Sequence, residues 1–149
     1  VVNLEGRVFM NNLDCPFRAA DAILDELRAR TPIVLVDFHA ETTSEKGAMG
    51  AYLDGRVSAV LGTHTHVQTA DERLLPAGTA FISDVGMTGS RDSVIGIRKE
   101  LSVERFLTQV PVRFEVAKKE PMLCGAIVTV DEQTGRARAI ERVLIVDPD

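Results

Sequence analysis

Three short apolar runs constrain the fold of this chain more strongly than any other feature of its sequence. They occupy residues 33–38, 57–61 and 79–82, and none of them alternates regularly between apolar and polar side chains. A strand that is covered on both faces has this pattern, which is typical of a parallel sheet with helices packed on it. A further strand is expected within residues 1–10, where Gly6 interrupts it.

Helices are expected in the intervals between these strands. The first is expected to begin at Asp14-Cys15-Pro16, with Asp14 as its cap, and to end before Pro32. A second helix is expected over Ser44–Leu53. Strands and helices that alternate in this way predict an α/β fold with right-handed parallel crossovers.

The last third of the sequence changes in character. Residues 112–117, 123–130 and 136–146 have the composition of strands, and residues 131–135 have that of a hairpin loop. A short helix with Ser102 as its cap is expected over Ser102–Gln109. We therefore expect antiparallel strands that flank the parallel part.

The domain organisation is expected to be simple. No repeat or linker divides residues 1–149, so we expect a single domain. The sequence opens at Val1 with no initiator Met, inside an expected strand, and this favours the C-terminal part of a larger domain.

Composition narrows the function. A net charge of −5 argues against a surface that holds DNA through its phosphates. No apolar run approaches the ~20 residues that span a bilayer, and no signal-peptide pattern is present. Cys15 and Cys124 are far apart in the sequence and are expected to be reduced thiols, as in a cytoplasmic protein.

All three histidines follow expected strands. His39 ends the first apolar run, and His64 and His66 follow the second. Ligands of open parallel sheets bind beyond the carboxyl ends of the strands, where these side chains should meet. Residues i and i+2 of an extended segment point the same way, and imidazole is a common ligand of transition metals. An isolated H-x-H pair is more often a surface feature, but the third histidine favours a site for one or two metal ions.

Acidic residues near the histidines have several open roles. They could bind metal, orient an imidazole or cap turns; these residues are Asp37, Glu41, Asp71 and Asp84. For Asp71 the turn cap is the favoured role. For Asp37, which lies inside a strand pattern, we expect a polar partner or a place at the end of the sheet.

The loop that follows the third apolar run is a candidate for substrate contact. Its candidate residues are Gly86, Thr88, Ser90 and Arg91, with Arg98 as a further cation. Backbone N–H groups, hydroxyls and arginine all suit a phosphate. A flexible glycine and serine connection explains the same composition equally well.

Nucleophilic chemistry finds little support. The sequence contains no G-x-S-x-G elbow, no P-loop lysine after Gly86, and no histidine close in sequence to either cysteine. A metal-dependent reaction therefore remains the leading hypothesis.

Three segments carry a family resemblance. Residues 36–46, 62–71 and 83–89 resemble, in order, the motifs of the YmdB-like metallophosphoesterases of the calcineurin-like superfamily. The resemblance implies a bacterial cytoplasmic enzyme with an α/β sandwich and two divalent metal ions, such as Fe, Mn or Zn. It also implies hydrolysis of a small phosphodiester substrate, namely 2′,3′-cyclic nucleotides to 3′-nucleotides. By motif position, His39 and His64 resemble ligands of one metal and His66 a ligand of the other.

Part of the family pattern is absent from this sequence. The aspartate motif, the Glu-Asn pair and the Asn-His pair do not occur, so the general-acid histidine is expected upstream and no catalytic residue is assigned here. The chain alone is expected to bind metal poorly and to have little activity. A different metallohydrolase, a non-enzymatic metal- or partner-binding chain, and assembly into a homo-oligomer remain open.

Overall fold

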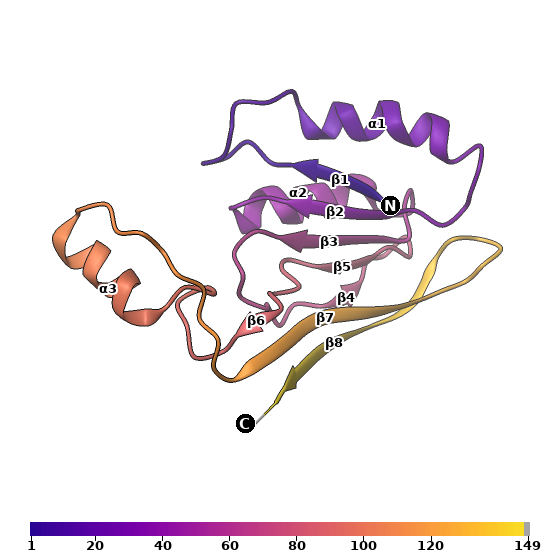
Figure 1. The fold of residues 1–149 in the computed structure, drawn as a ribbon. Helices are drawn as coiled ribbons and strands as arrows, with labels where there is room; N and C mark the ends of the chain where they lie inside the picture. The colour runs from indigo at the N-terminus through magenta and orange to yellow at the C-terminus, as the bar shows by residue number, and fades with distance from the viewer. Residues whose placement is uncertain (148–149) are drawn as a thin grey trace.

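A five-stranded, mostly parallel sheet forms the centre of the computed structural model, which describes residues 1–147 (Figure 1). Its strands lie in the order β1-β2-β3-β5-β4. Their bounds are β1 (Val2–Glu5), β2 (Leu35–His39), β3 (Ala59–Thr63), β4 (Arg73–Leu74) and β5 (Ala80–Ile82). The first four in this order are parallel and β4 is antiparallel to β5, so the predicted parallel α/β arrangement is confirmed.

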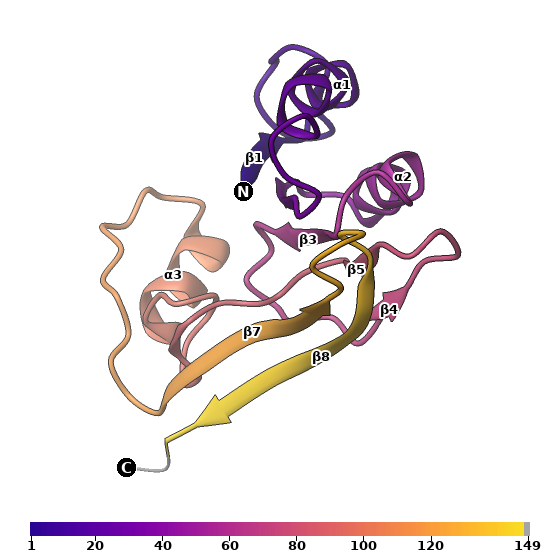
Figure 2. The ribbon, with the colours of Figure 1, turned by 90° about the vertical axis from the view of Figure 1, so that its right-hand side faces the viewer.

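Two helices cover one face of this sheet, and the C-terminal hairpin lies toward the other (Figure 2). Helix α1 (Pro16–Leu27) buries Ala20 and Leu24, and α2 (Thr43–Leu53) buries Met49, Gly50 and Leu53. Gly50 lies so close to the Phe81 ring that a Cβ there would be 2.5 Å from it. Helix α2 is therefore packed closely against β5.

The second sheet contains β6 (Gly89–Ser90), β7 (Pro121–Val130) and β8 (Ala137–Val146). The long β7–β8 hairpin confirms the antiparallel C-terminal part, and Asp131 organises its loop by accepting a hydrogen bond from the Thr134 backbone N–H at 2.9 Å. Between β6 and β7 the chain forms α3 (Lys99–Thr108), which stands apart from the central sheet (Figure 1). No helix within residues 1–147 has the length and apolar character needed to cross a membrane.

Strand bounds differ from expectation around the histidines. The strand expected at residues 57–61 is Ala59–Thr63, so it both begins and ends two residues later, and its backbone pairing with β2 continues to the His39–Thr63 pair. His39 is thus the last residue of β2, and His64 follows β3 directly. The short strands β4 and β6 were not predicted; each has only two residues and no apolar pattern of its own.

Two helix starts were predicted wrongly. The N-cap of α1 is Cys15 rather than Asp14, and its side chain makes no capping bond. Helix α3 begins at Lys99 with Arg98 as its N-cap, and Ser102 is buried inside the helix rather than capping it. A serine resembles a cap in sequence, but helix propagation from an earlier residue overrides that signal.

The expected strand at residues 112–117 is also wrong. Its apolar and polar residues alternate, but the only ladder contact formed within the described part of the segment is the single bridge between Ile97 and Val116. Without a neighbouring strand to pair with, an alternating pattern remains irregular backbone.

Gly62 provides a test of how closely the strands approach. A Cβ at this residue would lie 1.7 Å from the Ser83 carbonyl oxygen, so Gly62→Ala forces the backbone after β5 to move. We expect it to lower the free energy of unfolding by about 2 kcal/mol or more, measured by urea denaturation. The same change at Gly47 in α2 meets no atom within 4 Å and should stabilise the helix by about 0.5–1 kcal/mol. Equal effects at the two glycines would contradict this account.

Candidate metal centre

His39 and His64 meet at the carboxyl ends of β2 and β3. The Nδ1 atom of His64 lies 3.1 Å from the Nε2 atom of His39. The two rings are nearly perpendicular, at 85°, with centroids 4.8 Å apart. The structure therefore brings together two of the three histidines that the sequence proposed as a group.

A chain of hydrogen bonds orients His39. Its Nδ1 lies 3.1 Å from the Thr63 hydroxyl, which donates to Asp37 Oδ1 at 2.8 Å. The other Asp37 oxygen accepts from the Asn3 side-chain amide at 2.9 Å. Because the Thr63 proton is given to the carboxylate, Thr63 accepts from the Nδ1–H of His39. The Nε2 of a neutral His39 then keeps its lone pair and points at His64, which is the form that binds a metal. The polar partner expected for Asp37 is thus present.

A carboxylate orients His64 in a similar way. Its Nε2 lies 2.9 Å from Glu41 Oε2, and its backbone φ is 106°. A carboxylate at one ring nitrogen of a metal-binding histidine holds the proton there and leaves the other nitrogen for the metal. For His64 that other nitrogen is Nδ1, the atom that faces His39.

The pair fits two ligands of a single ion. Nitrogen atoms that each lie about 2.1 Å from one first-row metal ion are roughly 3 Å apart, close to the spacing seen here. Within residues 1–147, however, no group of three or more His, Cys, Asp or Glu side chains is arranged to hold a metal ion. This part of the chain offers an oriented pair of ligands rather than a full coordination shell.

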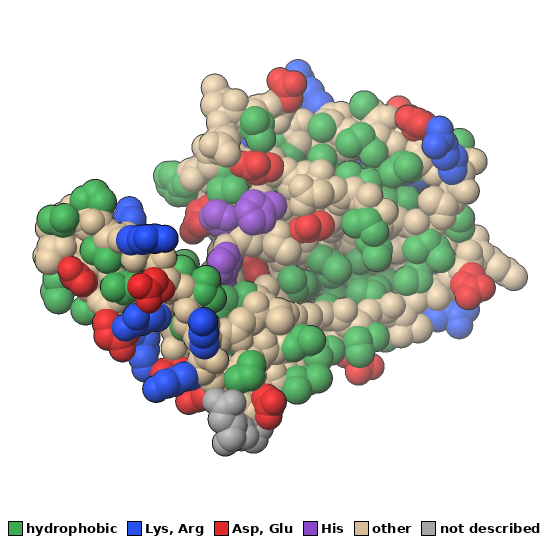
Figure 3. All heavy atoms as spheres, in the orientation of Figure 1, with side chains coloured by type: hydrophobic (Ala, Val, Ile, Leu, Met, Phe, Trp, Pro, Cys, Tyr) green, Lys and Arg blue, Asp and Glu red, His purple; other side chains and the backbone are tan. Residues whose placement is uncertain are grey.

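His66 is held separately. Its Nδ1 donates to the Ile95 carbonyl oxygen at 3.0 Å, and its backbone φ is 66°. This hydrogen bond leaves Nε2 with its lone pair. Figure 3 shows the histidine side chains together on one side of the molecule, beside a hollow that separates the α3 segment from the central body. His66 thus shares the surface of the pair without joining its hydrogen bonds.

A buried ion pair supports the segment between the histidines. Lys46 Nζ lies 2.8 Å from Asp84 Oδ2, and both side chains are 1% exposed. The same oxygen accepts from the backbone N–H and the hydroxyl of Thr65, at 3.0 and 2.8 Å, and Oδ1 accepts from the Gly86 N–H at 2.9 Å. Burial alone would raise the pKa of Asp84, but the hydrogen bonds from Lys46, Gly86 and Thr65 outweigh it and hold the pKa below its usual value.

Sequence reasoning missed Lys46. A signal existed, because Lys46 shares a helical face with the buried residues Met49, Gly50 and Leu53. A lysine on an apolar face must find an anion inside, and Asp84 is that anion. Asp84 therefore has a supporting role among the alternatives that the sequence left open.

Asp71 joins two segments rather than capping its own turn, so the favoured turn-capping role is wrong. It accepts from the Thr69 hydroxyl at 2.6 Å, and from the backbone N–H and hydroxyl of Ser83 at 3.0 and 2.6 Å. These bonds join the segment that follows the histidines to the end of β5.

The candidate substrate residues fall into two groups. Ser90 is buried in β6, where its hydroxyl donates to the Lys119 carbonyl, and Gly86 has a φ of 82° and packs against Gln68 and Cys124. Thr88 and Arg91 are exposed. The further candidate Arg98 is 2.7 Å from Glu115, which already neutralises its charge. Thr88 and Arg91 are therefore the side chains of this group that remain accessible to a ligand.

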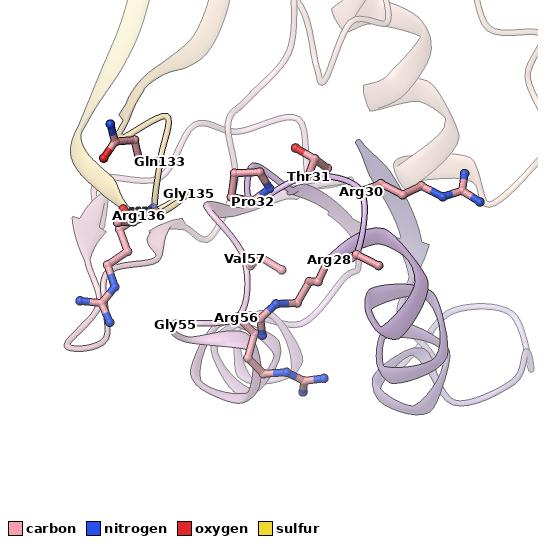
Figure 4. Close-up of a pocket in the computed structure, with 12 residues that line it drawn as sticks. Arg28, Arg30, Thr31, Pro32, Gly55, Arg56, Val57, Gln133, Gly135 and Arg136 are labelled. Carbon is pink, nitrogen blue, oxygen red and sulfur yellow. Dashed lines mark hydrogen bonds between the residues drawn. The ribbon is translucent and has the colours of Figure 1, made fainter.

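A pocket at the opposite, amino-terminal ends of the strands is rich in arginine, but its geometry does not favour a site. It is lined in part by Arg28, Arg30, Arg56 and Arg136. Arg30 pairs with Glu26 and Arg56 with Asp21, each at 2.6 Å. Figure 4 shows the Arg30 and Arg136 side chains pointing away from each other rather than converging.

Comparison with known proteins establishes the family. The model of the YmdB-like protein family matches residues 1–143, so the chain belongs to that family. The chain is 55% identical to the 2′,3′-cyclic-nucleotide 2′-phosphodiesterase of Bacillus subtilis, over 99% of the chain and 56% of that protein. It is 42% identical to a putative phosphatase/phosphodiesterase of Mycoplasma pneumoniae, over 90% of the chain and 47% of that protein. The chain therefore spans about half the length of these relatives.

Solved structures share the fold. A hypothetical protein from Thermus thermophilus superposes with a TM-score of 0.92 at 46% identity, covering 99% of this chain and 57% of that one. A novel phosphatase from Mycoplasma pneumoniae gives a TM-score of 0.88 at 40% identity, covering 98% and 53%.

Removing the Lys46 charge tests the support of the histidine segment. Lys46→Met keeps most of the side-chain length but leaves Asp84 buried without its cation, so we expect a loss of about 3–5 kcal/mol in the free energy of unfolding. Urea denaturation measures it, with the exposed ion-pair variant Arg30→Ala as a control that should be nearly neutral. A Lys46→Met protein as stable as the control would show that the pair does not hold this region.

The pKa of Asp84 adds a pH dependence with a definite sign. A carboxylate whose folded-state pKa is lowered stabilises the protein above the unfolded pKa, about 3.9, and this contribution is lost as pH falls through the folded pKa. Asp84→Asn should therefore flatten the fall in stability below about pH 4. An unchanged slope in stability measured from pH 6 to 2 would contradict the assignment.

Proposed function

We propose that the protein to which this chain belongs is a metal-dependent phosphodiesterase. In this proposal the chain supplies His39, His64 and His66 as ligands. The observation that carries the proposal is the His39–His64 pair, in which each ring has a partner on its far nitrogen and turns the other nitrogen toward the same space. The names of the Bacillus and Mycoplasma relatives support phosphodiester chemistry.

The proposed substrates are 2′,3′-cyclic nucleotides, which would yield 3′-nucleotides, as the name of the Bacillus relative indicates for that protein. Two divalent ions, when bound, would neutralise the phosphate and make hydroxide available at neutral pH. His39 and His64 would hold one ion and His66 the other. Thr88 and Arg91 are exposed and would contact the phosphate, while Gly86 and Ser90 shape the loop that carries them.

The general acid is not proposed within this chain. Its three histidines are assigned to metal, and His39 and His64 each use both ring nitrogens in the pair and its supports. We propose that the leaving group is protonated by a residue of the longer protein, and that this chain alone binds metal weakly. The two free cysteines, Cys15 and Cys124, are consistent with the proposed cytoplasmic location.

A substrate screen separates this proposal from another metallohydrolase. The full-length protein would be incubated with Mn²⁺, Fe²⁺ or Zn²⁺ and with 2′,3′-cyclic AMP, bis(p-nitrophenyl) phosphate, and p-nitrophenyl ester and anilide substrates. We expect hydrolysis of the two phosphodiesters, its loss with a chelator and its recovery on adding metal. Hydrolysis of the ester or anilide alone would favour a different metallohydrolase, and no hydrolysis with any metal would favour a non-enzymatic role.

Replacing the paired histidine tests the ligand assignment. His64→Ala removes one ligand of an ion, so we expect kcat/KM for 2′,3′-cyclic AMP to fall by about 100-fold or more, beyond the 10–100-fold typical of losing a supporting residue. Arg30→Ala, far from the site at the end of α1, should keep full activity. Wild-type activity in the His64→Ala protein would remove the pair from the reaction.

The Thr63 hydroxyl tests the orientation of His39 without touching a ligand. Thr63→Val keeps the shape but breaks the link to Asp37, so we expect the metal affinity of the full-length protein to fall by about 10–100-fold in calorimetric titration. The same substitution at Thr108, whose hydroxyl donates to the Glu104 carbonyl and accepts from the Val110 backbone N–H, should leave the affinity unchanged. Equal affinities for the two variants would show that the relay does not prepare His39 for metal.

A further inference from the structure

An apolar pocket of about 330 Å³ lies between α3 and the segments on either side of it. The residues that matter here are Ile95, Ile97, Ser102, Arg105, Phe106 and Phe114. Two backbone hydrogen bonds join the segments that carry Ile97 and Phe114, from Arg98 N–H to the Glu115 carbonyl and from Ala117 N–H to the Gly96 carbonyl, at 3.0 and 2.9 Å. The pocket therefore belongs to the segment between β6 and β7, outside the central sheet.

One residue, Ile95, contacts both this pocket and the proposed metal ligand His66. The Ile95 carbonyl accepts the hydrogen bond from His66, while the Ile95 side chain lines the pocket. Ile95 has a φ of 47°, a left-handed conformation that is rare and strained for a β-branched residue. Such strain persists where the surroundings require it, and it is concentrated at functional sites. Here it accompanies a residue that contacts both His66 and the pocket.

The pocket walls suit a flat aromatic group. The rings of Phe106 and Phe114 remain 72% and 44% exposed, although both line the pocket. The Arg105 guanidinium lies 5.2 Å from the Phe114 ring centroid, so a cationic plane borders the same space. Stacking on aromatic rings and guanidinium planes is how proteins hold nucleobases without strong sequence preference.

The surface of the pocket is almost entirely apolar. Ser102 and Arg105 line it, but their polar atoms contribute almost nothing to that surface. The pocket would therefore hold a ligand by apolar contact and stacking. Small-molecule pockets have mostly apolar walls, and their volumes start near 300 Å³.

We propose that this pocket binds the nucleobase of a nucleotide whose phosphate lies at the histidines. The proposal rests on the proposed phosphodiesterase function and adds a recognition site for the base. In a nucleotide the ribose joins the phosphate to the base, and here Ile95 joins His66 to the pocket. Phe114 and Phe106 stack on the base.

Adenosine, which carries a base but no phosphate, tests the pocket independently of metal and catalysis. Binding of adenosine to the full-length protein would be followed by saturation-transfer NMR and calorimetry, with ribose as the probe that lacks a base. We expect adenosine to bind, ribose not to bind, and Phe114→Leu to weaken adenosine by about tenfold. Phe9→Leu, at a ring that is 88% exposed outside the pocket, is the matched control and should have no effect.

Kinetics then separate this proposal from the function on which it rests. Phe114→Leu should raise KM for 2′,3′-cyclic AMP by about tenfold with little change in kcat, and should leave hydrolysis of methyl ribofuranoside 2,3-cyclic phosphate, which has no base, unchanged. Thermal melting of Phe114→Leu checks that this variant folds. If neither phosphodiester is hydrolysed but adenosine still binds in a Phe114-dependent way, the proposed function fails and the pocket stands.

Three results would overturn the pocket itself. They are no binding of adenosine, unchanged adenosine affinity and KM in Phe114→Leu, and equal binding of ribose. For the second result, sedimentation would measure the oligomeric state and so show what the exposed rings do instead. If Phe114→Leu changes the oligomeric state while adenosine affinity stays the same, the exposed rings belong to a contact between copies of the chain.

Discussion

The buried ion pair between Lys46 and Asp84 is the interaction on which the site depends most. Moving two charges out of water costs several kcal/mol per ion, which is recovered only where geometry and further hydrogen bonds are good. Asp84 meets this condition because Thr65 and Gly86 fill its remaining acceptor positions. The carboxylate therefore holds Thr65 toward the interior through two hydrogen bonds. The residues on either side of Thr65, His64 and His66, both have left-handed backbone conformations. A single buried anion thus joins α2, the end of β5 and the histidine segment.

Much of the fold could be predicted because burial leaves a strong pattern. Strands β2, β3 and β5 bury most of their apolar residues, so their sequences are largely apolar, and their order with α1 and α2 gives the parallel sheet. Boundaries were less predictable, since Gly62 and Thr63 join β3 through pairing with β2 and not through any apolar signal. The region around α3 was predicted worst. There the large apolar residues stay exposed, among them Phe106 and Leu107, so pattern and burial no longer agree.

The site, like the fold, was predictable only in part from its sequence. That His39 and His64 meet follows from parallel strands, whose carboxyl ends share one edge of the sheet. The separate position of His66 could not be predicted, because residues i and i+2 share a side only in extended backbone, and both histidines have positive φ. The relay from His39 through Thr63 to Asp37 depends on the register of β2 and β3, which the sequence specifies only after pairing is known.

The orientation of the ligands has a consequence for how a metal would be held. Each imidazole of the pair already has a partner on its far nitrogen, so folding itself fixes the ring positions and protons that a metal would require. The loss of side-chain conformational entropy thus occurs on folding, and metal binding would not require it again. Yet a pair of nitrogens cannot fill a coordination shell of four or more, and the described residues offer no third acidic, histidine or cysteine ligand in place. Affinity for a metal would therefore come from ligands beyond this pair, while the pair would determine where the ion lies relative to the sheet.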